Sequence, residues 1–177
     1  YLETNDFGLM LLKLSPSGEI LWESIYTEGS YGFTGLSARI IDSTFYLWGR
    51  TGSPQGTRLC CLTLEMNGNV LDFNVTDPYS DNFLTYYHID EKGDFMVGDQ
   101  CCEYKVTKFN SKGVKMWQYI KPVLNANPTG VNARLTCIKT DSENNVYAAG
   151  QYYVNDTFYT VVTTKLNELG DTIWERM

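Results

Sequence analysis

The stretch Lys13-Leu-Ser-Pro-Ser-Gly18-Glu-Ile-Leu-Trp22 decides the fold, because the same pattern returns later in the chain. Close copies run from Lys108 to Trp117 and from Lys165 to Trp174. A weaker copy spans 63–72 and carries Asp72 in the tryptophan position. A period of roughly 50 residues is typical of repeat architectures. The turn glycines of the four copies are Gly18, Gly68, Gly113 and Gly170.

A second recurring phrase alternates with the first. It reads Ile41-Asp-Ser-Thr-Phe-Tyr-Leu-Trp-Gly49 and returns at 89–98 and 140–150. In both phrases a short run of Asp, Asn, Ser and Gly separates two runs rich in β-branched and aromatic residues, which predicts a hairpin. Two hairpins give four strands per repeat. In the first full repeat we expect them near 35–41, 45–49, 58–64 and 70–75.

Four-stranded antiparallel units at this spacing predict an all-β fold, namely a β-propeller with about three and a half blades in this chain. We expect residues 1–34 to be the C-terminal half of a blade, and 35–82, 83–132 and 133–177 to be one blade each. Three and a half blades would leave bare sheet edges. We therefore expect the chain to be a piece of a longer polypeptide.

The recurring large and small residues suit the packing of neighbouring blades. A buried tryptophan contributes roughly 150–250 Å² of contact area, so the repeated ring fits between two sheets. We assign this structural role, in place of a ligand-binding one, to the residues that recur at the ends of the two phrases: Trp22, Trp117, Trp174, Gly49, Gly98 and Gly150.

At these residues the chain resembles two groups of propellers. The Gly-x-x-x-Trp phrase resembles the tryptophan-docking repeat of quinoprotein-like propellers, which include the outer-membrane-assembly lipoprotein. Together with the phrase at 141–150, it is similar to the secreted propeller repeats of many Bacteroidetes cell-surface proteins. The resemblance implies export to the cell surface or periplasm, and a place in an outer-membrane or secretion-associated assembly. It carries little information on activity, because one fold serves many functions.

Composition excludes several functions. The net charge of −7 argues against a nucleic-acid partner, and no apolar run is long enough for a direct membrane span. His88 is the single histidine, and the five cysteines form no C-x-x-C motif. We expect the adjacent cysteine pairs at 60–61 and 101–102 to be small buried residues. The sequence therefore predicts no metal site, no cofactor and no catalytic residues. The loop at 141–145 could be read as calcium ligands, but a plain turn fits it better.

The longer connections between predicted strands point to a binding face. They span 27–34, 50–57, 77–82, 99–103, 121–132 and 151–157, and in a meander they all lie at one end of the sheets. Loops on a rigid scaffold commonly carry binding residues. We therefore predict a partner or ligand site formed by Tyr31, Phe33, Arg50, Tyr79, Tyr152 and Tyr153.

We expect a non-catalytic scaffold or interaction module with a protein partner. Two alternatives remain open: a propeller that binds surface glycans, and an enzyme of the quinoprotein or glycan-cleaving kind with its site in the central channel. For such a site Asp99 and Asp156 are the acidic candidates on the loop face.

Overall fold

The computed structural model describes residues 8–27, 33–52, 57–77, 84–99, 104–121, 133–155 and 158–177. These residues form an all-β protein of antiparallel sheets, without a helix in the described ranges. The chain divides into two compact units, Tyr1–Ser80 and Asp81–Met177, which we call unit 1 and unit 2 and describe separately.

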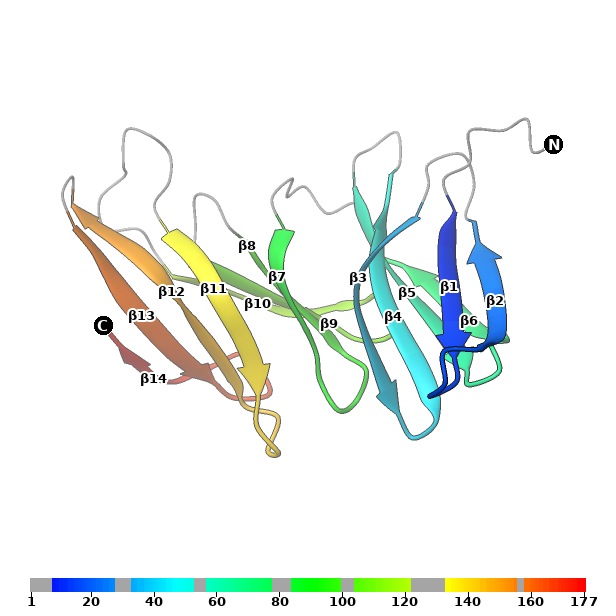
Figure 1. Ribbon diagram of the computed structural model, residues 1–177. Coiled ribbons are helices and arrows are strands. Elements are labelled where there is room, and N and C mark those ends of the chain that lie inside the picture. Colours follow the sequence, from blue (N-terminus) through cyan, green and yellow to red (C-terminus); the bar gives the residue numbers. More distant parts are fainter. Residues whose placement is uncertain are drawn as a thin grey trace. The chain divides into compact units, whose positions relative to one another are not determined.

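Unit 1 contains a two-stranded and a four-stranded sheet (Figure 1). The first sheet consists of β1 and β2, and the second has the order β3-β4-β5-β6. The bounds are β1 Leu9–Leu14, β2 Ile20–Tyr26, β3 Phe33–Ile41, β4 Thr44–Thr51, β5 Arg58–Glu65 and β6 Val70–Val75.

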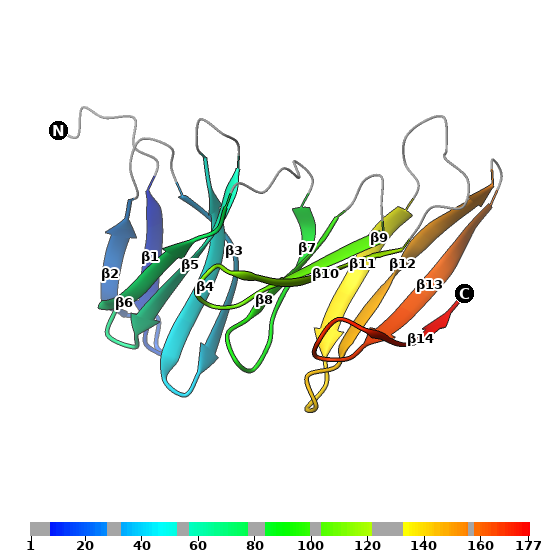
Figure 2. The same cartoon turned by 180° about the vertical axis from the view of Figure 1, so that it is seen from behind.

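Unit 2 contains two four-stranded sheets, β7-β8-β9-β10 and β11-β12-β13-β14, and Figure 2 shows both from behind. The bounds are β7 Leu84–Ile89, β8 Phe95–Asp99, β9 Tyr104–Phe109, β10 Lys115–Lys121, β11 Ala133–Thr140, β12 Val146–Asn155, β13 Phe158–Leu166 and β14 Thr172–Arg176. Each predicted strand of the four repeats therefore has an observed counterpart.

The tight turns explain why the repeats fold into hairpins. In the turn at 15–19, the Ser15 amide donates to the Glu19 carbonyl at 2.8 Å, and the Gly18 amide donates to the Ser15 carbonyl at 3.0 Å. The same pair of bonds closes the turns at 65–69, 90–94, 110–114, 141–145 and 167–171. The fourth residue of each turn has a positive φ, which favours glycine, and only Asn144 departs from this rule.

The core of each unit lies between its two sheets. In unit 1, Phe33, Leu47, Cys60, Leu62 and Leu64 are buried together, with residues of β1 and β2 packed against them. In unit 2 the corresponding cluster is larger and contains Met96, Tyr104, Val106, Ala133, Leu135, Ile138, Val146, Ala148, Val162 and Leu166.

The cysteine prediction is confirmed where it can be examined. Cys60 and Cys61 are fully buried thiols on β5, and neither is in a disulfide. Burial, with a smaller contribution from Asp72, raises the pKa of the Cys61 thiol to about 12, so it remains protonated. Cys137 is free and exposed, and residues 101 and 102 lie outside the described ranges.

Candidate functional site

Two of the repeated tryptophans dock on a glycine turn of the next sheet. In unit 1, the Trp22 indole Nε1 donates to the Met66 carbonyl at 3.1 Å, and a Cβ built on Gly68 would lie 3.3 Å from the ring. In unit 2, the Trp117 Nε1 donates to the Glu168 carbonyl at 2.9 Å. Glycine at these turns therefore lets the indole pack directly on the backbone.

The same geometry defines two kinds of sheet surface. We call the surface that carries the tryptophan the tryptophan face, and the surface that receives it, with its glycine turn, the turn face. A Cβ built on Gly170 would lie 2.7 Å from the Trp117 ring, so the turn face leaves no room for a side chain there. Trp174 stands on the equivalent face of the last sheet, half-buried, with Tyr147 edge-on at 6.1 Å between ring centroids.

The three glycines that end the second phrase, Gly49, Gly98 and Gly150, are buried, and close approach explains each of them. A Cβ on Gly49 would lie 2.6 Å from the Thr34 carbonyl oxygen on the neighbouring strand. A Cβ on Gly98 would overlap Leu135 of the adjacent sheet, and one on Gly150 would overlap the backbone of β11. All three positions are therefore packing positions.

The predicted loop face is corrected in part. Phe33 and Arg50 belong to β3 and β4, because the ladder between those strands extends to the pair Phe33–Thr51. Phe33 is only 6% exposed and lies edge-on to Phe73, so it is a core residue and not an exposed loop residue. Arg50 is exposed.

The remaining predicted binding residues lie at the edge of what the structure describes. Tyr152 and Tyr153 continue β12, where they pair with Thr160 and Tyr159, so the connection after β12 starts later than predicted. The side chains of those two tyrosines, and all of Tyr31 and Tyr79, lie outside the described residues. Of the acidic candidates, Asp99 ends β8 and Asp156 lies outside the described ranges.

Unit 1 has a pocket that the sequence did not reveal. Its volume is about 410 Å³, within the usual range for ligand pockets. It lies between β2 on one side and β5 and β6 on the other. Its wall is formed by Ile25, Tyr26, Thr27, Phe33, Leu62, Val70 and Phe73, and we call it the aromatic pocket.

The wall of the aromatic pocket is predominantly apolar, and its main polar group already has a partner. Phe33 and Leu62 are buried at its base, whereas Val70 and Ile25 are more than half exposed at its rim. The Tyr26 hydroxyl donates to the Gly68 carbonyl at 2.7 Å, which holds the ring in place. The pocket is therefore suited to an apolar group and offers few fixed polar contacts.

The equivalent place in unit 2 is filled. Counting from the docking tryptophan and its turn glycine, Tyr119 takes the position of Ser24 in unit 1, and Glu175 takes that of Phe73. The Tyr119 hydroxyl donates to Glu175 Oε2 at 3.0 Å, and Lys121 forms an ion pair with the same carboxylate. Tyr119 also packs edge-on against the buried Tyr104 at 6.4 Å between ring centroids.

The electrostatics of the Tyr119, Glu175 and Lys121 group favour these hydrogen bonds and the ion pair. Burial, together with the neighbouring Glu175 carboxylate, raises the pKa of Tyr119 to about 12, so its hydroxyl remains a proton donor. Burial alone would raise the pKa of Glu175, but the bonds from Lys121 and Tyr119 lower it below its ordinary value. The carboxylate is therefore ionised at neutral pH and is held by Lys121, Tyr119 and the Thr164 hydroxyl.

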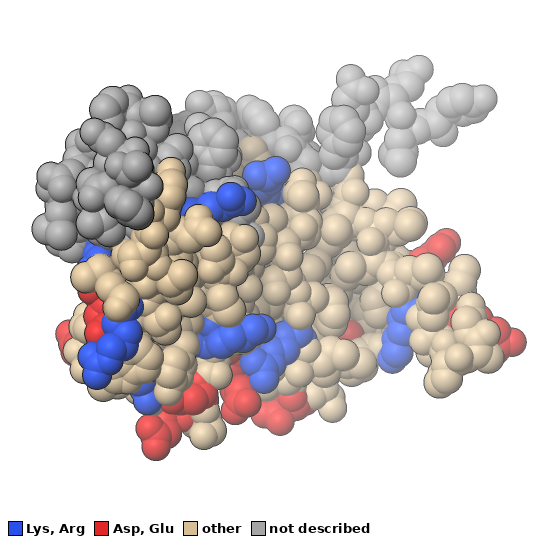
Figure 3. Space-filling view, turned by 60° about the vertical axis from the view of Figure 1, so that its left-hand side comes forward, with Lys and Arg blue, Asp and Glu red and all other residues tan. Residues whose placement is uncertain are grey.

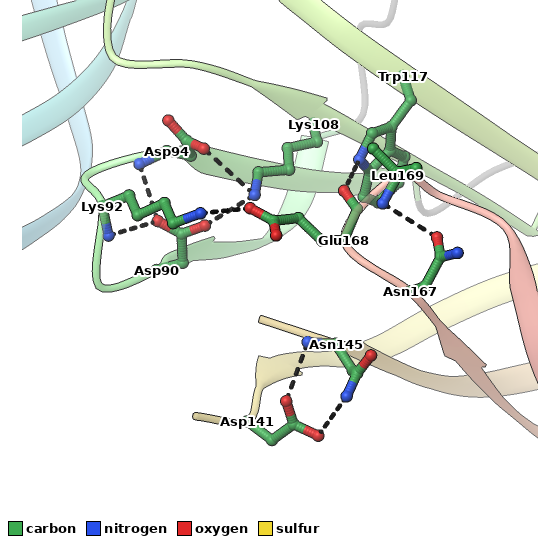
Figure 4. Close-up of polar contacts among 10 residues, drawn as sticks. All are labelled: Asp90, Lys92, Asp94, Lys108, Trp117, Asp141, Asn145, Asn167, Glu168 and Leu169. Carbon is green, nitrogen blue, oxygen red and sulfur yellow. Dashed lines mark hydrogen bonds and ion pairs between the residues drawn. The ribbon is translucent and has the colours of Figure 1, made fainter. Parts of the chain in front are cut away.

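A charged cluster reinforces the junction in unit 2 (Figure 4). The ammonium group of Lys108 is fully buried, 2.9 Å from Asp90 Oδ2 and 3.2 Å from Asp94 Oδ2. Lys92 pairs with Glu168, which lies in the turn that receives Trp117. Burial and the neighbouring Asp90 raise the pKa of Asp94, in spite of Lys108. Lys108 therefore ties β9 to the 90–94 turn of its own sheet, and the Lys92–Glu168 pair links that turn to the neighbouring sheet.

The loop at 141–145 is a turn whose carboxylate is already in use. Asp141 Oδ1 accepts the backbone amides of Glu143 and Asn145, and Oδ2 accepts the Asn145 side-chain amide. Chiefly these bonds to Asn145 hold the pKa of Asp141 at about 2. Within the described part of the chain, no group of three or more His, Cys, Asp and Glu side chains could hold a metal ion.

Comparisons with known proteins give a distant likeness. No family model matches the chain, and no curated protein matches it. Among solved structures, the chain is similar to a protein of unknown function from Bacteroides caccae, with 10% sequence identity and a TM-score of 0.40. The match covers 96% of this chain and 72% of that one. The described residues contain no helix long and apolar enough to cross a membrane.

Sequence reasoning missed the aromatic pocket because its residues come from four strands. Tyr26, Leu62 and Phe73 are ordinary strand residues when each is considered alone. One signal was present in the repeat alignment, where the small Ser24 stands at the position of Tyr119. Ser24 directly precedes Ile25, Tyr26 and Thr27, which line the pocket.

Proposed function

We propose that this chain is part of a β-propeller that acts as a non-catalytic interaction module. The sheets of the two units would be its blades, with residues 1–34 forming half of one. The docking of a tryptophan on the next sheet, seen once in each unit, supports this arrangement because it is the kind of contact that can repeat from blade to blade.

The aromatic pocket is the observation that carries the binding role. It is open at a place where the repeat-equivalent residues of unit 2 fill the space with a tyrosine and an ion pair. Its wall suits an apolar side chain of a protein partner, since partially buried aromatic pockets commonly receive such anchors. A sugar would require more polar contacts than the engaged Tyr26 hydroxyl and the exposed Thr27 provide.

We further propose that the chain works at the cell surface or in the periplasm, within an outer-membrane or secretion-associated assembly. This part of the proposal depends on the resemblance of the repeats to those of exported propellers. A protein partner in such an assembly is consistent with a pocket that accepts an apolar anchor.

The pocket can be tested by NMR with N-acetyl-leucine amide as the probe. We expect the probe to shift the methyl resonances of Ile25, Leu62 and Val70. Ser24→Tyr should abolish these shifts, because it places in unit 1 the tyrosine that fills the equivalent site in unit 2. Lys112→Tyr, in an exposed turn of unit 2, is the matched control and should leave them unchanged.

Two outcomes would overturn the binding role as stated. Equal shifts in the wild type and in Ser24→Tyr would show that the probe does not enter the aromatic pocket. Shifts at the same methyl groups with methyl glucoside, and none with N-acetyl-leucine amide, would favour a glycan ligand over a protein one.

A further inference from the structure

Asp72 interrupts the repeated motif next to the aromatic pocket. It stands where the other three copies of the motif carry the docking tryptophan. Its side chain is exposed on β6, the outermost strand of the β3-β4-β5-β6 sheet. A local departure from a pattern that the rest of the fold follows is expected at functional positions.

The carboxylate of Asp72 lies beside the wall of the pocket. The Phe73 amide donates to Asp72 Oδ1 at 2.9 Å, and Phe73 is one of the residues that line the pocket. The Asn74 side-chain amide donates to Oδ2 at 2.8 Å. Both donors are neutral, and in the part of the chain that the structure describes Asp72 forms no ion pair. Two hydrogen bonds therefore hold a negative charge at the rim of the pocket.

The outer strands of unit 1 offer no cation to balance this charge. β2 and β6, together with the turns before them at 15–19 and 65–69, contain no lysine or arginine. Their charged residues are Glu19, Glu23, Glu65 and Asp72. On the neighbouring β1, Lys13 donates to the Met66 carbonyl at 2.8 Å. The outer strands on both sides of the pocket are therefore acidic only.

The corresponding elements of unit 2 carry both charges. β10 and β14, with the turns before them at 110–114 and 167–171, contain Lys112, Lys115, Lys121, Glu168, Asp171, Glu175 and Arg176. Figure 3, which brings the β11 to β14 side of Figure 1 forward, shows basic and acidic side chains close together along its lower margin. Lys121 pairs with Glu175, whereas Tyr26 stands at the position of Lys121 in unit 1. The cation that unit 2 supplies itself is thus missing from the outer strands of unit 1.

We propose that the protein segment bound by the aromatic pocket carries a lysine or arginine next to its apolar anchor, and that this cation pairs with Asp72. The inference rests on the proposed binding role of the pocket and adds the chemistry of the partner. Consecutive Cα atoms are about 3.8 Å apart. With the anchor against Phe73, an adjacent lysine can therefore reach a carboxylate that lies 2.9 Å from the Phe73 amide.

Asp72 is then a specificity-determining residue at the rim, and the pocket itself provides the apolar contact. Charges at the rim of an interface mainly select among partners and guide their approach. A basic segment is favoured at this site, and an acidic segment with the same apolar anchor is repelled.

Three peptides that share a leucine anchor test this preference: acetyl-Lys-Leu-Lys-amide, acetyl-Gln-Leu-Gln-amide and acetyl-Glu-Leu-Glu-amide. NMR titration of the Ile25, Leu62 and Val70 methyl groups measures their affinities. We expect the lysine peptide to bind about fivefold more tightly than the glutamine peptide, since an exposed ion pair contributes modestly. The glutamate peptide should bind most weakly. The preference should shrink between about 50 mM and about 500 mM sodium chloride, because salt screens exposed charges.

Two substitutions at Asp72 and one control locate the preference. Asp72→Asn removes the charge and keeps an oxygen for the Phe73 amide, so the lysine peptide should lose most of its advantage while the glutamine peptide is unaffected. Asp72→Lys should reverse the order of the charged peptides. Glu23→Gln removes one charge from the other outer strand, on the sheet face opposite to the docked Trp22, and should leave the preference unchanged.

The inference is overturned if the lysine and glutamate peptides bind the wild type equally while the glutamine peptide still shifts the methyl groups. In that case the binding role of the pocket stands. It is also overturned if Asp72→Asn and Glu23→Gln reduce the preference equally, which would assign the preference to the net charge of the chain. If none of the three peptides shifts the methyl groups, the binding role itself fails, and this inference fails with it.

Discussion

The tryptophan junctions of unit 1 and unit 2 are built on the same motif but differ in the residues that surround the indole. Both place an indole on a glycine turn, with Nε1 bound to the carbonyl two residues before the glycine. In unit 2, a larger core, a buried ion cluster and the Tyr119–Glu175–Lys121 group close the remaining space. In unit 1, Ser24 and Phe73 stand at the equivalent positions and a pocket remains.

The difference shows that the repeated motif provides the docking geometry, whereas the residues around it determine whether the junction is sealed or open. In unit 1 the first sheet has two strands, so fewer side chains are available to cover β3 to β6. In unit 2, Leu135 on β11 packs so close to Gly98 on β8 that these two strands, from different sheets, are in direct contact. The open junction is the one for which we propose a partner.

The largest expected effect comes from the buried lysine. Lys108→Met should lower the free energy of unfolding by about 3–5 kcal/mol, because it leaves Asp90 and Asp94 without their buried cation. The equivalent change in unit 1, Lys13→Met, removes a single bond to the Met66 carbonyl and should cost about 1 kcal/mol. Urea denaturation measures both. Equal losses would contradict the view that charge seals only the junction in unit 2.

A smaller effect, different in kind, is expected from the docked tryptophans. Trp117→Ala should cost about 3 kcal/mol, yet the core beneath it should keep the two sheets of unit 2 together. Trp22→Ala should cost about 2 kcal/mol, and the β1–β2 sheet should lose its attachment. Amide hydrogen exchange would show lost protection throughout β1 and β2 in the second variant. Retained protection there would show that Leu9, Leu11 and Tyr26 suffice to hold the sheet.

Alanine substitutions at the turn glycines compare the two junctions position by position. Alanine at Gly18, Gly68 or Gly170 adds left-handed strain of about 1–2 kcal/mol at each position. Gly170→Ala should cost roughly 1–3 kcal/mol more, because its methyl group would overlap the Trp117 ring. Gly68→Ala should be intermediate and Gly18→Ala lowest. Thermal unfolding gives the order. Equal losses of stability for Gly18→Ala and Gly170→Ala would show that the Trp117 ring moves aside at no cost.

The weak copy of the repeat coincides with the boundary between the units. The last sheet of unit 1 carries Asp72, paired with Thr63, where the other sheets pair a tryptophan with a lysine. The chain divides at Ser80 and Asp81, directly after that sheet. Each unit thus contains one docked tryptophan.

Much of the fold could be predicted because turn chemistry and strand alternation act locally. The positive φ that Gly18, Gly68, Gly113 and Gly170 adopt was predictable from their neighbours in the sequence. The ends of the strands were harder to predict from the sequence. Ladder bonds extend β12 through Tyr152 and Tyr153, and they extend β3 back to Phe33, although the loop-like composition around these residues predicted otherwise.

By itself, the sequence determined the number and order of hairpins, the strands they connect and the recurring tryptophans, since these follow from patterns within about ten residues. Only the tertiary structure decided which carbonyl each indole binds, that Phe33 is buried, and that one junction holds a pocket where the other holds an ion pair. Those outcomes depend on side chains up to 56 residues apart that meet across two sheets. The difference between Ser24 and Tyr119 at the same repeat position could be interpreted only once the residues opposite them, Phe73 and Glu175, were known.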